Sequence, residues 1–279
     1  MMSKAGKLSK ALAYIIAFIV FCFYIFPFIL IVINSFKSNG EILTNPFALP
    51  ESWRFSHFKE VFVRMNFPVT FKNSLIITVF STLLILLFSS MAAYHLVRKP
   101  TKYNKIFFSI LVASMVIPFQ SLMIPLIHIY GAKFRLIHQM PIPLLIGFYI
   151  GFGSSLSIFI FHGFIKSIPY EIEEAARIDG CNTLQTYFFV VLPLLKPITV
   201  TVAVINILWI WNDYLLPSLV LSTESVFTMP IKMKVFFGTY MNDWELLIPA
   251  ILITILPIYI FYFLCQKYVI SGVIQGSIK

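Results

Sequence analysis

A polar group interrupts an apolar stretch in the second half of this 279-residue chain; its members are Asn206, Trp209, Asn212 and Asp213. Amides and carboxylates bind the hydroxyl groups of a polyhydroxylated ligand, and aromatic rings pack on its apolar faces. The group therefore predicts either the lining of a ligand path or hydrogen bonds between packed helices. On one continuous helix, Asn206 and Asp213 are expected to share a face, with Asn212 about 100° away from Asp213.

A second polar segment, residues 166–197, holds four of the 11 acidic residues and is predicted to form two short helices joined by a turn. Its glutamates follow Pro169, where the positive end of a helix dipole favours acidic side chains. Gly180 is expected to end the first helix with a positive φ angle. Asn182 or Thr183 is expected to cap the helical piece that follows.

The first helix of this segment is predicted to present a shallow apolar face, formed by Ile172, Ala175, Ala176 and Ile178. Glu173 precedes Arg177 by four residues, which is the order that favours an ion pair along a helix. Such a face is suited to the groove of another protein. An amphipathic helix on the membrane surface is the alternative, and it is disfavoured because anionic lipids repel the three glutamates.

Several other kinds of site are not indicated by the sequence. There is no G-x-x-x-x-G-K-[ST] pattern, so the chain has no phosphate-binding loop of its own. The five histidines lack metal-ligand spacing, and the three cysteines imply no disulfide framework. We therefore expect no catalytic residue, no metal site and no cofactor.

The composition predicts an integral membrane protein. Hydrophobic residues make up 59% of the chain and charged residues only 11%, whereas a soluble domain usually has about 25% charged residues. A bilayer core of about 30 Å needs roughly 20 apolar helical residues for each crossing. Six runs meet this requirement, at about 11–34, 74–97, 106–129, 142–165, 198–221 and 246–264. Prolines within these runs are expected to mark kinks.

Basic residues predict the orientation of the spans. The amino terminus carries Lys4, Lys7 and Lys10, and the loop after the second span carries Arg98, Lys99, Lys102 and Lys105. Neither segment contains an acidic residue, so the positive-inside rule places both in the cytoplasm. The expected fold is an all-α integral membrane protein with six transmembrane helices, both termini cytoplasmic. Residues 1–279 form one transmembrane domain, with the cytoplasmic loop 166–197 between spans four and five.

The net charge of +10 has a simpler explanation than nucleic acid. Basic residues that flank membrane spans account for it, so no nucleic-acid partner is expected.

The polar segment resembles a loop of ABC-importer permeases, E-A-A-x3-G-x9-I-x-L-P. The matching residues are Glu174, Ala175, Ala176, Gly180, Leu192 and Pro193. Val190 in place of isoleucine is the one departure. In that family the loop forms a coupling helix seated in a cleft of a cytosolic ATPase subunit. The resemblance therefore implies that these residues transmit the closing motion of the ATPase to the membrane helices.

Four further stretches resemble carbohydrate-importer permeases of the maltose type: 26–38, 45–62, W-N-D-Y-L-L-P-S-L-V-L at 211–221, and the carboxy-terminal 266–279. The set is similar to the smaller, six-span partner of a sugar permease pair. It implies a second related permease, two cytosolic ATPase subunits and an extracytoplasmic sugar-binding protein as partners. The implied location is a bacterial or archaeal cytoplasmic membrane, where the chain spans the lipid bilayer several times.

Two alternatives and one open point remain at the level of sequence. An ABC-importer permease for a non-sugar solute would share the coupling loop but not the 211–221 and carboxy-terminal patterns. A secondary transporter would be expected to carry repeats and several buried ionisable groups, whereas Asp213 is the one acidic residue placed within a span. The ending 272–279 is expected either to contact the ATPase pair or to be a disordered terminus.

Overall fold

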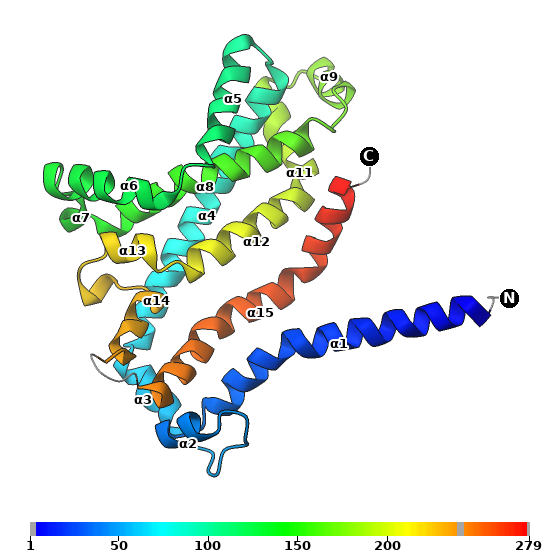
Figure 1. Ribbon diagram of the computed structural model, residues 1–279. Coiled ribbons are helices and arrows are strands. Elements are labelled where there is room, and N and C mark those ends of the chain that lie inside the picture. Colours follow the sequence, from blue (N-terminus) through cyan, green and yellow to red (C-terminus); the bar gives the residue numbers. More distant parts are fainter. Residues whose placement is uncertain (1–3, 239–242, 278–279) are drawn as a thin grey trace. The chain divides into compact units, whose positions relative to one another are not determined.

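The computed structural model describes residues 4–238 and 243–277, and every regular element over this range is a helix (Figure 1). Side-chain surroundings are described for residues 10, 12–238 and 243–266. The chain divides into two compact units. Unit 1 comprises residues 1–67 and 233–256, and unit 2 comprises 68–232 and 257–279. This division does not test the prediction of one transmembrane domain, which stays a prediction.

Unit 1 contains the amino-terminal helices and the start of the last one. Its elements are α1 (Lys4–Asn34), α2 (Asn39–Thr44), α3 (Ser56–Arg64), the 3-10 turn η4 (Met233–Phe236) and the first part of α15 (Trp244–Ser277).

The loops of unit 1 are fixed by hydrogen bonds. The Lys37 ammonium is 1% exposed and donates to the carbonyls of Asn45 and Pro46. A reciprocal capping box joins Ser38 and Glu41 at the start of α2. Hydrogen bonds from the Ser38 backbone and hydroxyl lower the pKa of Glu41 to about 2. Because this pKa is depressed, the contribution of Glu41 to stability is present above its ordinary value of 4.5 and is lost as pH falls towards 2.

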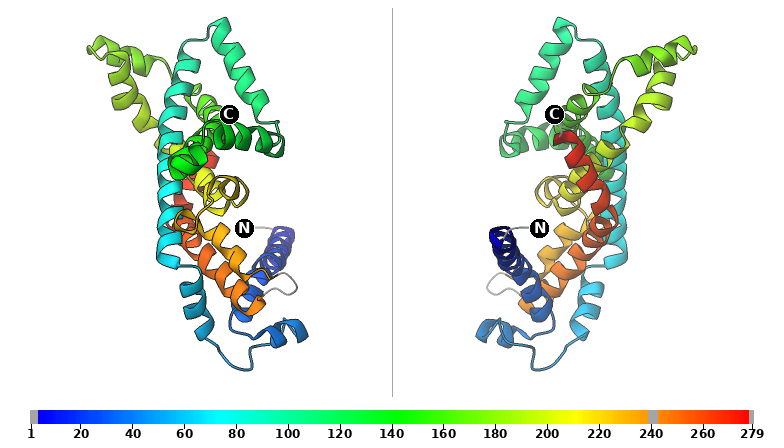
Figure 2. Two further views of the ribbon diagram at one scale, coloured as in Figure 1. Left: turned by 90° about the vertical axis from the view of Figure 1, so that its left-hand side faces the viewer. Right: turned by 90° about the vertical axis from the view of Figure 1, so that its right-hand side faces the viewer.

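Unit 2 contains the rest of the helices. They are α4 (Phe67–Arg98), α5 (Lys102–Ser114), α6 (Phe119–Leu126), the π-helix η1 (Ile127–Lys133), α7 (Leu136–Gln139), α8 (Pro141–Ile165), α9 (Glu171–Ile178), α10 (Thr183–Gln185), the π-helix η2 (Thr186–Val191), α11 (Leu192–Leu194), α12 (Lys196–Asn212), α13 (Leu215–Val220), the 3-10 turn η3 (Glu224–Val226) and α14 (Met229–Lys232). Figure 2 shows α4 running along the length of this unit.

Two buried clusters form the core of unit 2. One surrounds Phe161 and Tyr187 and joins the carboxy-terminal halves of α4 and α8 to η2 and α12. The other surrounds Leu145 and Tyr149 and joins α4 and α8 to α13 and α14. Helices α4, α8 and α12 each contribute to both clusters, so they link the surroundings of the polar segment 166–197 to those of α13.

Among the described residues, four helices are long and apolar enough to span a membrane: α1, α4, α8 and α15. The predicted third span, 106–129, is instead two helices that meet at 94°. The break falls at Pro118, which precedes α6 in an extended conformation and biases Ile117 away from helix. The predicted fifth span, 198–221, also differs, because α12 ends at Asn212 and α13 is separate. Two pairs of helices are bent, 102–114 with 119–133 and 183–194 with 196–212, and six spans result only if each pair crosses the membrane once.

The ends of the predicted spans also shift. Helix α4 begins seven residues before position 74, and α15 continues from Trp244 to Ser277 instead of ending near 264. Pro27 lies within α1, so a proline does not by itself end a membrane helix. The predicted ATPase contact of 272–279 involves side chains outside the described part, and positions 278 and 279 lie beyond it altogether.

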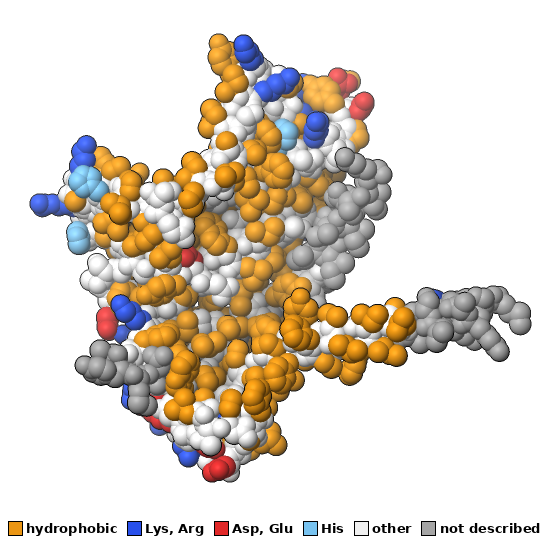
Figure 3. All heavy atoms as spheres, in the orientation of Figure 1, with side chains coloured by type: hydrophobic (Ala, Val, Ile, Leu, Met, Phe, Trp, Pro, Cys, Tyr) orange, Lys and Arg blue, Asp and Glu red, His pale blue; other side chains and the backbone are white. Residues whose placement is uncertain are grey.

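Much of the described surface is apolar. Figure 3 shows orange side chains over broad areas of the face in view. The apolar window of α1 is not buried against the rest of the described chain, and Phe23 and Tyr24 are 75% and 69% exposed. A surface of this extent needs lipid or a partner helix to cover it. The protein is therefore a multi-pass membrane protein.

Candidate functional site

Helix α9 is the central element of the polar segment, and its carboxy-terminal end is closed by a Schellman motif. The Cys181 amide donates to the Ala176 carbonyl at 3.0 Å, and the Gly180 amide donates to Arg177 at 3.0 Å. Gly180 has a φ of +90°, which confirms the predicted left-handed position. Asn182 then caps α10 through a reciprocal pair with Gln185. The chain therefore makes a sharp, fully hydrogen-bonded turn after α9.

A buried ion pair holds α9 against the end of α4. The Glu173 side chain is 0% exposed, and its Oε1 accepts from Arg98 Nε at 2.6 Å. Its Oε2 accepts from the Tyr94 hydroxyl at 2.8 Å. Arg98 also donates from Nη2 to the Ile168 carbonyl at 3.0 Å, which fixes the chain just before α9. Both carboxylate oxygens are thus satisfied, as a buried charge requires.

This arrangement corrects two predictions about α9. Glu173 pairs with Arg98 across the unit, not with Arg177 along the helix. Arg177 instead donates to the Tyr170 hydroxyl at 2.7 Å and lies over that ring. Ala176 was expected on the exposed face, but it is 8% exposed because it lies three residues after Glu173 on the inward side.

The remaining face of α9 is open. Glu174, Ala175, Ile172 and Ile178 are exposed, and Ile178 reaches 86%. An isoleucine this exposed next to a small alanine and a free carboxylate forms a shallow surface with one charged group. It matches the kind of helix face that lies in another protein's groove.

The Leu192–Pro193 pair connects the polar segment to α12. Pro193 lies in the first turn of α11, where its missing amide costs no hydrogen bond. Leu192 is half-buried and packs against the cluster around Phe161 and Tyr187. The segment 183–194 meets α12 at 77°, and Leu195 at the bend is fully buried. Packed side chains therefore connect α9 through η2 and α11 to α12.

Gly180→Leu is expected to impair coupling without preventing membrane insertion. A side chain in a left-handed position costs on the order of 1 kcal/mol, and the turn after α9 would change direction. Gly180→Asn is the matched control, because asparagine tolerates this conformation. Substrate-stimulated ATPase activity and membrane abundance should be measured for both. Equal ATPase activity of the Leu variant and the unmodified protein would contradict a role of this turn in coupling.

The second predicted group divides between two surroundings. Asn206 is 4% exposed, and its amide donates to Ser157 Oγ of α8 at 3.1 Å and to the Val202 carbonyl at 2.8 Å. Asp213 accepts from the Tyr149 hydroxyl of α8 at 2.9 Å and from the Leu215 amide at 3.0 Å. Both therefore hold α8 of the same chain.

The expected shared helix face of Asn206 and Asp213 is wrong. Asp213 lies beyond the end of α12, with φ −71° and ψ 127°. Its carboxylate accepts from the amide two residues on, which closes a local turn in place of another helical turn. Asn212 is exposed and bonds to the Leu208 carbonyl. Trp209 is 40% exposed and meets Tyr149 edge to face at 5.4 Å.

Asp213→Leu is expected to destabilise the junction of α8 and α12, while Asp213→Asn is nearly tolerated. The Leu variant leaves the Tyr149 hydroxyl, which is 0% exposed, without its acceptor. An unsatisfied buried hydroxyl costs about 1–3 kcal/mol. The Asn variant keeps an acceptor oxygen. The thermal midpoint of each purified variant tests this prediction. An equal fall in the midpoint of both variants would show that the charge of Asp213 matters more than its hydrogen bond.

Four residues of these sites had no signal in the sequence analysis. They are Tyr94, Arg98, Tyr149 and Ser157. Arg98 was assigned to a positive cytoplasmic loop, and its 75-residue separation from Glu173 conceals the pairing. Tyr149 lies in an apolar run that was predicted as a span and offered no sign of a polar partner.

Comparisons with known proteins identify the family. The chain belongs to the family of binding-protein-dependent transport system inner membrane components, which matches residues 85–275. It is 44% identical, over 92% of each chain, to a probable starch degradation products transport system permease protein, AmyC, of Thermoanaerobacterium thermosulfurigenes. It is 36% identical over the full length of both chains to the melibiose/raffinose/stachyose import permease protein MelC of Bacillus subtilis.

A solved structure has the same fold. A chain in the crystal structure of a bacterial ABC transporter involved in the import of the acidic polysaccharide alginate has a TM-score of 0.78. It is 24% identical, and the match covers 96% of this chain and 99% of that one. The protein is thus an ABC-importer permease, a transport subunit whose energy comes from ATP hydrolysed by separate subunits. Family membership decides against a secondary transporter.

Proposed function

We propose that this chain is one of two related permease subunits in an importer that moves a sugar or oligosaccharide across a bacterial cytoplasmic membrane. The observation that carries the proposal is the exposed face of α9, held on a buried ion pair. The names of the relatives AmyC and MelC, which denote starch degradation products and melibiose, raffinose and stachyose, support the substrate class. The partners are a second permease, two cytosolic ATPase subunits and an external sugar-binding protein.

In this proposal the bent pair 102–133 crosses the membrane once and α12 forms the membrane part of the fifth span, giving six spans with both termini in the cytoplasm. The basic residues Lys4, Lys7, Lys10, Lys99 and Lys102 support this orientation. Segment 166–197 then faces the cytoplasm. There Glu174 and Ala175 contact the ATPase, and Gly180, Leu192 and Pro193 set the direction in which α9 moves.

Coupling follows from two connections of α9. Its Glu173 is bonded to α4 through Arg98 and Tyr94, so a push on α9 acts directly on a membrane helix. Its carboxy-terminal side continues through η2 and α11 into α12. Both connections are packed or hydrogen-bonded, so they transmit displacement instead of absorbing it.

The polar group near the end of α12 has two roles in this proposal. Asn206 and Asp213 position α12 on α8, because their hydrogen-bonding groups are occupied there. Trp209 and Asn212 are exposed in this chain and form the part that faces the translocation path or the companion permease. An indole face and an amide suit a sugar's apolar face and hydroxyls.

Affinity purification of the tagged chain from its native membrane tests the assembly. We expect one copy of this chain, one related permease and two ATPase copies, with mass measured for the intact complex. Two copies of this chain and no second permease would contradict the heterodimer. Thermal shifts of the co-encoded binding protein with a panel of mono- and oligosaccharides then identify the substrate. A shift with none of the sugars would contradict the substrate class.

A further inference from the structure

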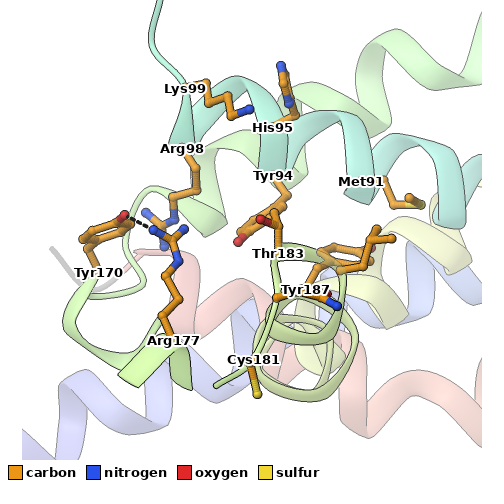
Figure 4. Close-up of a pocket in the computed structure, with 12 residues that line it drawn as sticks. Met91, Tyr94, His95, Arg98, Lys99, Tyr170, Arg177, Cys181, Thr183 and Tyr187 are labelled. Carbon is orange, nitrogen blue, oxygen red and sulfur yellow. Dashed lines mark hydrogen bonds between the residues drawn. The ribbon is translucent and has the colours of Figure 1, made fainter. Parts of the chain in front are cut away.

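A pocket of about 720 Å³ lies between the carboxy-terminal end of α4 and segment 170–187. Figure 4 shows the side chains that line it: Met91, Tyr94, His95, Arg98, Lys99, Tyr170, Arg177, Cys181, Thr183 and Tyr187 are labelled there. All of these residues belong to unit 2. The pocket is separate from the exposed face of α9 and from the polar group at the end of α12.

The lining is strongly biased towards positive charge. It includes two arginines, a lysine and a histidine, and none of its residues is acidic. The guanidinium groups of Arg98 and Arg177 lie 5.7 Å and 5.4 Å from the centre of the Tyr170 ring. Figure 4 shows the two groups close together beside that ring. Like charges this close repel one another unless an anion compensates them.

One carboxylate is not enough to compensate this cluster. Glu173 is fully engaged by Arg98 and Tyr94, so it neutralises one of the two arginines. The described hydrogen-bond partners of Arg177 are the neutral hydroxyl groups of Tyr170 and Tyr94. The Lys99 ammonium makes no hydrogen bond or ion pair within the described part of the chain. The pocket therefore holds two solvent-exposed cations, Arg177 and Lys99, that have no acidic partner within the described residues, beside the Arg98–Glu173 pair.

The rest of the lining suits an amphiphile with an anionic head. Met91 and Leu184 add apolar surface, and Leu184 is 61% exposed. Thr183 and Asn182 add neutral hydrogen-bonding groups. Arginine binds phosphate oxygens through two parallel N–H groups, and lysine adds a point charge. Basic pockets between transmembrane helices on the cytoplasmic side characteristically bind anionic lipid head groups.

We propose that this pocket binds a phosphate-bearing anion through Arg177 and Lys99, supplied by the head group of an anionic phospholipid or by free phosphate. The bound anion completes the charge balance of the Arg98–Arg177–Tyr170 cluster, so it stabilises the position of α9 relative to α4. Only the leaflet that supplies the lipid depends on the proposed orientation of the importer. The binding itself requires neither transport nor a particular sugar.

Cys181 lines the pocket and provides a reporter for the test. The other two cysteines, Cys22 and Cys265, are replaced by serine, and the full chain with its co-purifying subunits is placed in nanodiscs. The rate at which a maleimide modifies Cys181 is measured by mass spectrometry. One arm compares phosphatidylcholine discs with discs that also contain phosphatidylglycerol. The other arm adds inorganic phosphate to phosphatidylcholine discs, with sodium chloride at equal ionic strength as the control.

We expect slower modification of Cys181 in at least one arm. Protection by phosphatidylglycerol alone identifies a lipid site, and protection by phosphate identifies a site for the free anion. Arg177→Gln should lower the affinity for the protecting anion roughly tenfold or more, because it removes a charge-assisted hydrogen bond. Lys102→Gln removes an equal charge from the nearby start of α5, outside this pocket, and should leave protection unchanged.

Three results would overturn the proposal. The first is an unchanged modification rate in both arms. The second is protection that is equal in the Arg177→Gln and Lys102→Gln variants, which would indicate a general effect of charge. The third is protection that depends on the ATPase subunits and not on either anion, which would show that the pocket receives a protein surface. Failure of sugar transport, by contrast, would leave this measurement unaffected.

Discussion

Membranes that carry the Glu173→Ala variant are expected to contain much less folded complex than membranes with the unmodified chain. The substitution leaves Arg98, whose side chain is 12% exposed, without its carboxylate. Breaking a buried pair from one side costs about 3–5 kcal/mol. The neighbouring pocket admits water to Arg98, so we expect the lower end of this range. The midpoint of thermal denaturation in detergent and the yield of monodisperse protein measure the effect.

Glu174→Ala is the matched control for this prediction. It removes the same side chain from the next position, where the carboxylate is exposed, and stability should be unchanged. The double variant Glu173→Met, Arg98→Met should regain most of the stability, because replacing both partners removes the uncompensated charge. A double-mutant cycle built from Glu173→Met, Arg98→Met and this double variant would then give an interaction free energy of about 3 kcal/mol. Additive effects of the two single substitutions would contradict the ion pair.

Gly153→Leu is expected to disrupt the packing of α8 on α12. A Cβ atom at Gly153 would lie 2.8 Å from Ile85 Cδ1, 2.9 Å from Asn206 Oδ1 and 3.3 Å from Trp209 Cζ3. The Ile85 side chain can turn aside, but Asn206 is held by two hydrogen bonds and the indole is rigid. Overpacking of a core costs about 1–3 kcal/mol, and leucine adds more atoms than the Cβ alone.

Gly151→Leu provides the control on the same helix. A Cβ atom at Gly151 or Gly147 meets no described atom within 4 Å, so this variant should keep the stability of the unmodified chain. The spacing Gly147-x-x-x-Gly151, followed by Gly153, is typical of close helix packing, and within this chain the structure supports that role for Gly153. Equal thermal midpoints of the Gly153→Leu and Gly151→Leu variants would contradict the close contact with Asn206 and Trp209.

The local features of segment 166–197 were predictable because each depends on neighbouring residues. Gly180 tolerates a left-handed backbone, and Asn182 caps a helix with its own side chain, so sequence spacing is sufficient. The pairing of Glu173 was not predictable in this way. Arg177 and Arg98 offer the same charge, and only the path of the chain decides which guanidinium reaches the carboxylate. Glu173 pairs with Arg98 and not with Arg177 because Arg98 approaches from the buried side of α9.

The positions at which helices break were less predictable than their existence. Pro27 and Pro257 lie within continuous helices, whereas Pro118 coincides with a 94° bend. A proline removes one backbone donor in each case, and the surrounding packing decides whether the helix continues. The end of α12 follows from Asp213, whose carboxylate accepts from both Tyr149 and the Leu215 amide. The position at which α12 ends therefore depends in part on Tyr149, which lies 64 residues away in the sequence.

ATP-driven uptake of the cognate sugar into proteoliposomes measures directly whether α9 couples this permease to separate ATPase subunits. The complete complex is compared with this chain alone and with a complex that carries Glu174→Lys, which reverses a charge on the exposed face of α9. We expect uptake only by the complete complex with ATP and binding protein, and strongly reduced uptake by the Glu174→Lys complex at equal abundance. Uptake by the chain alone, or unchanged uptake by the Glu174→Lys complex, would contradict the account.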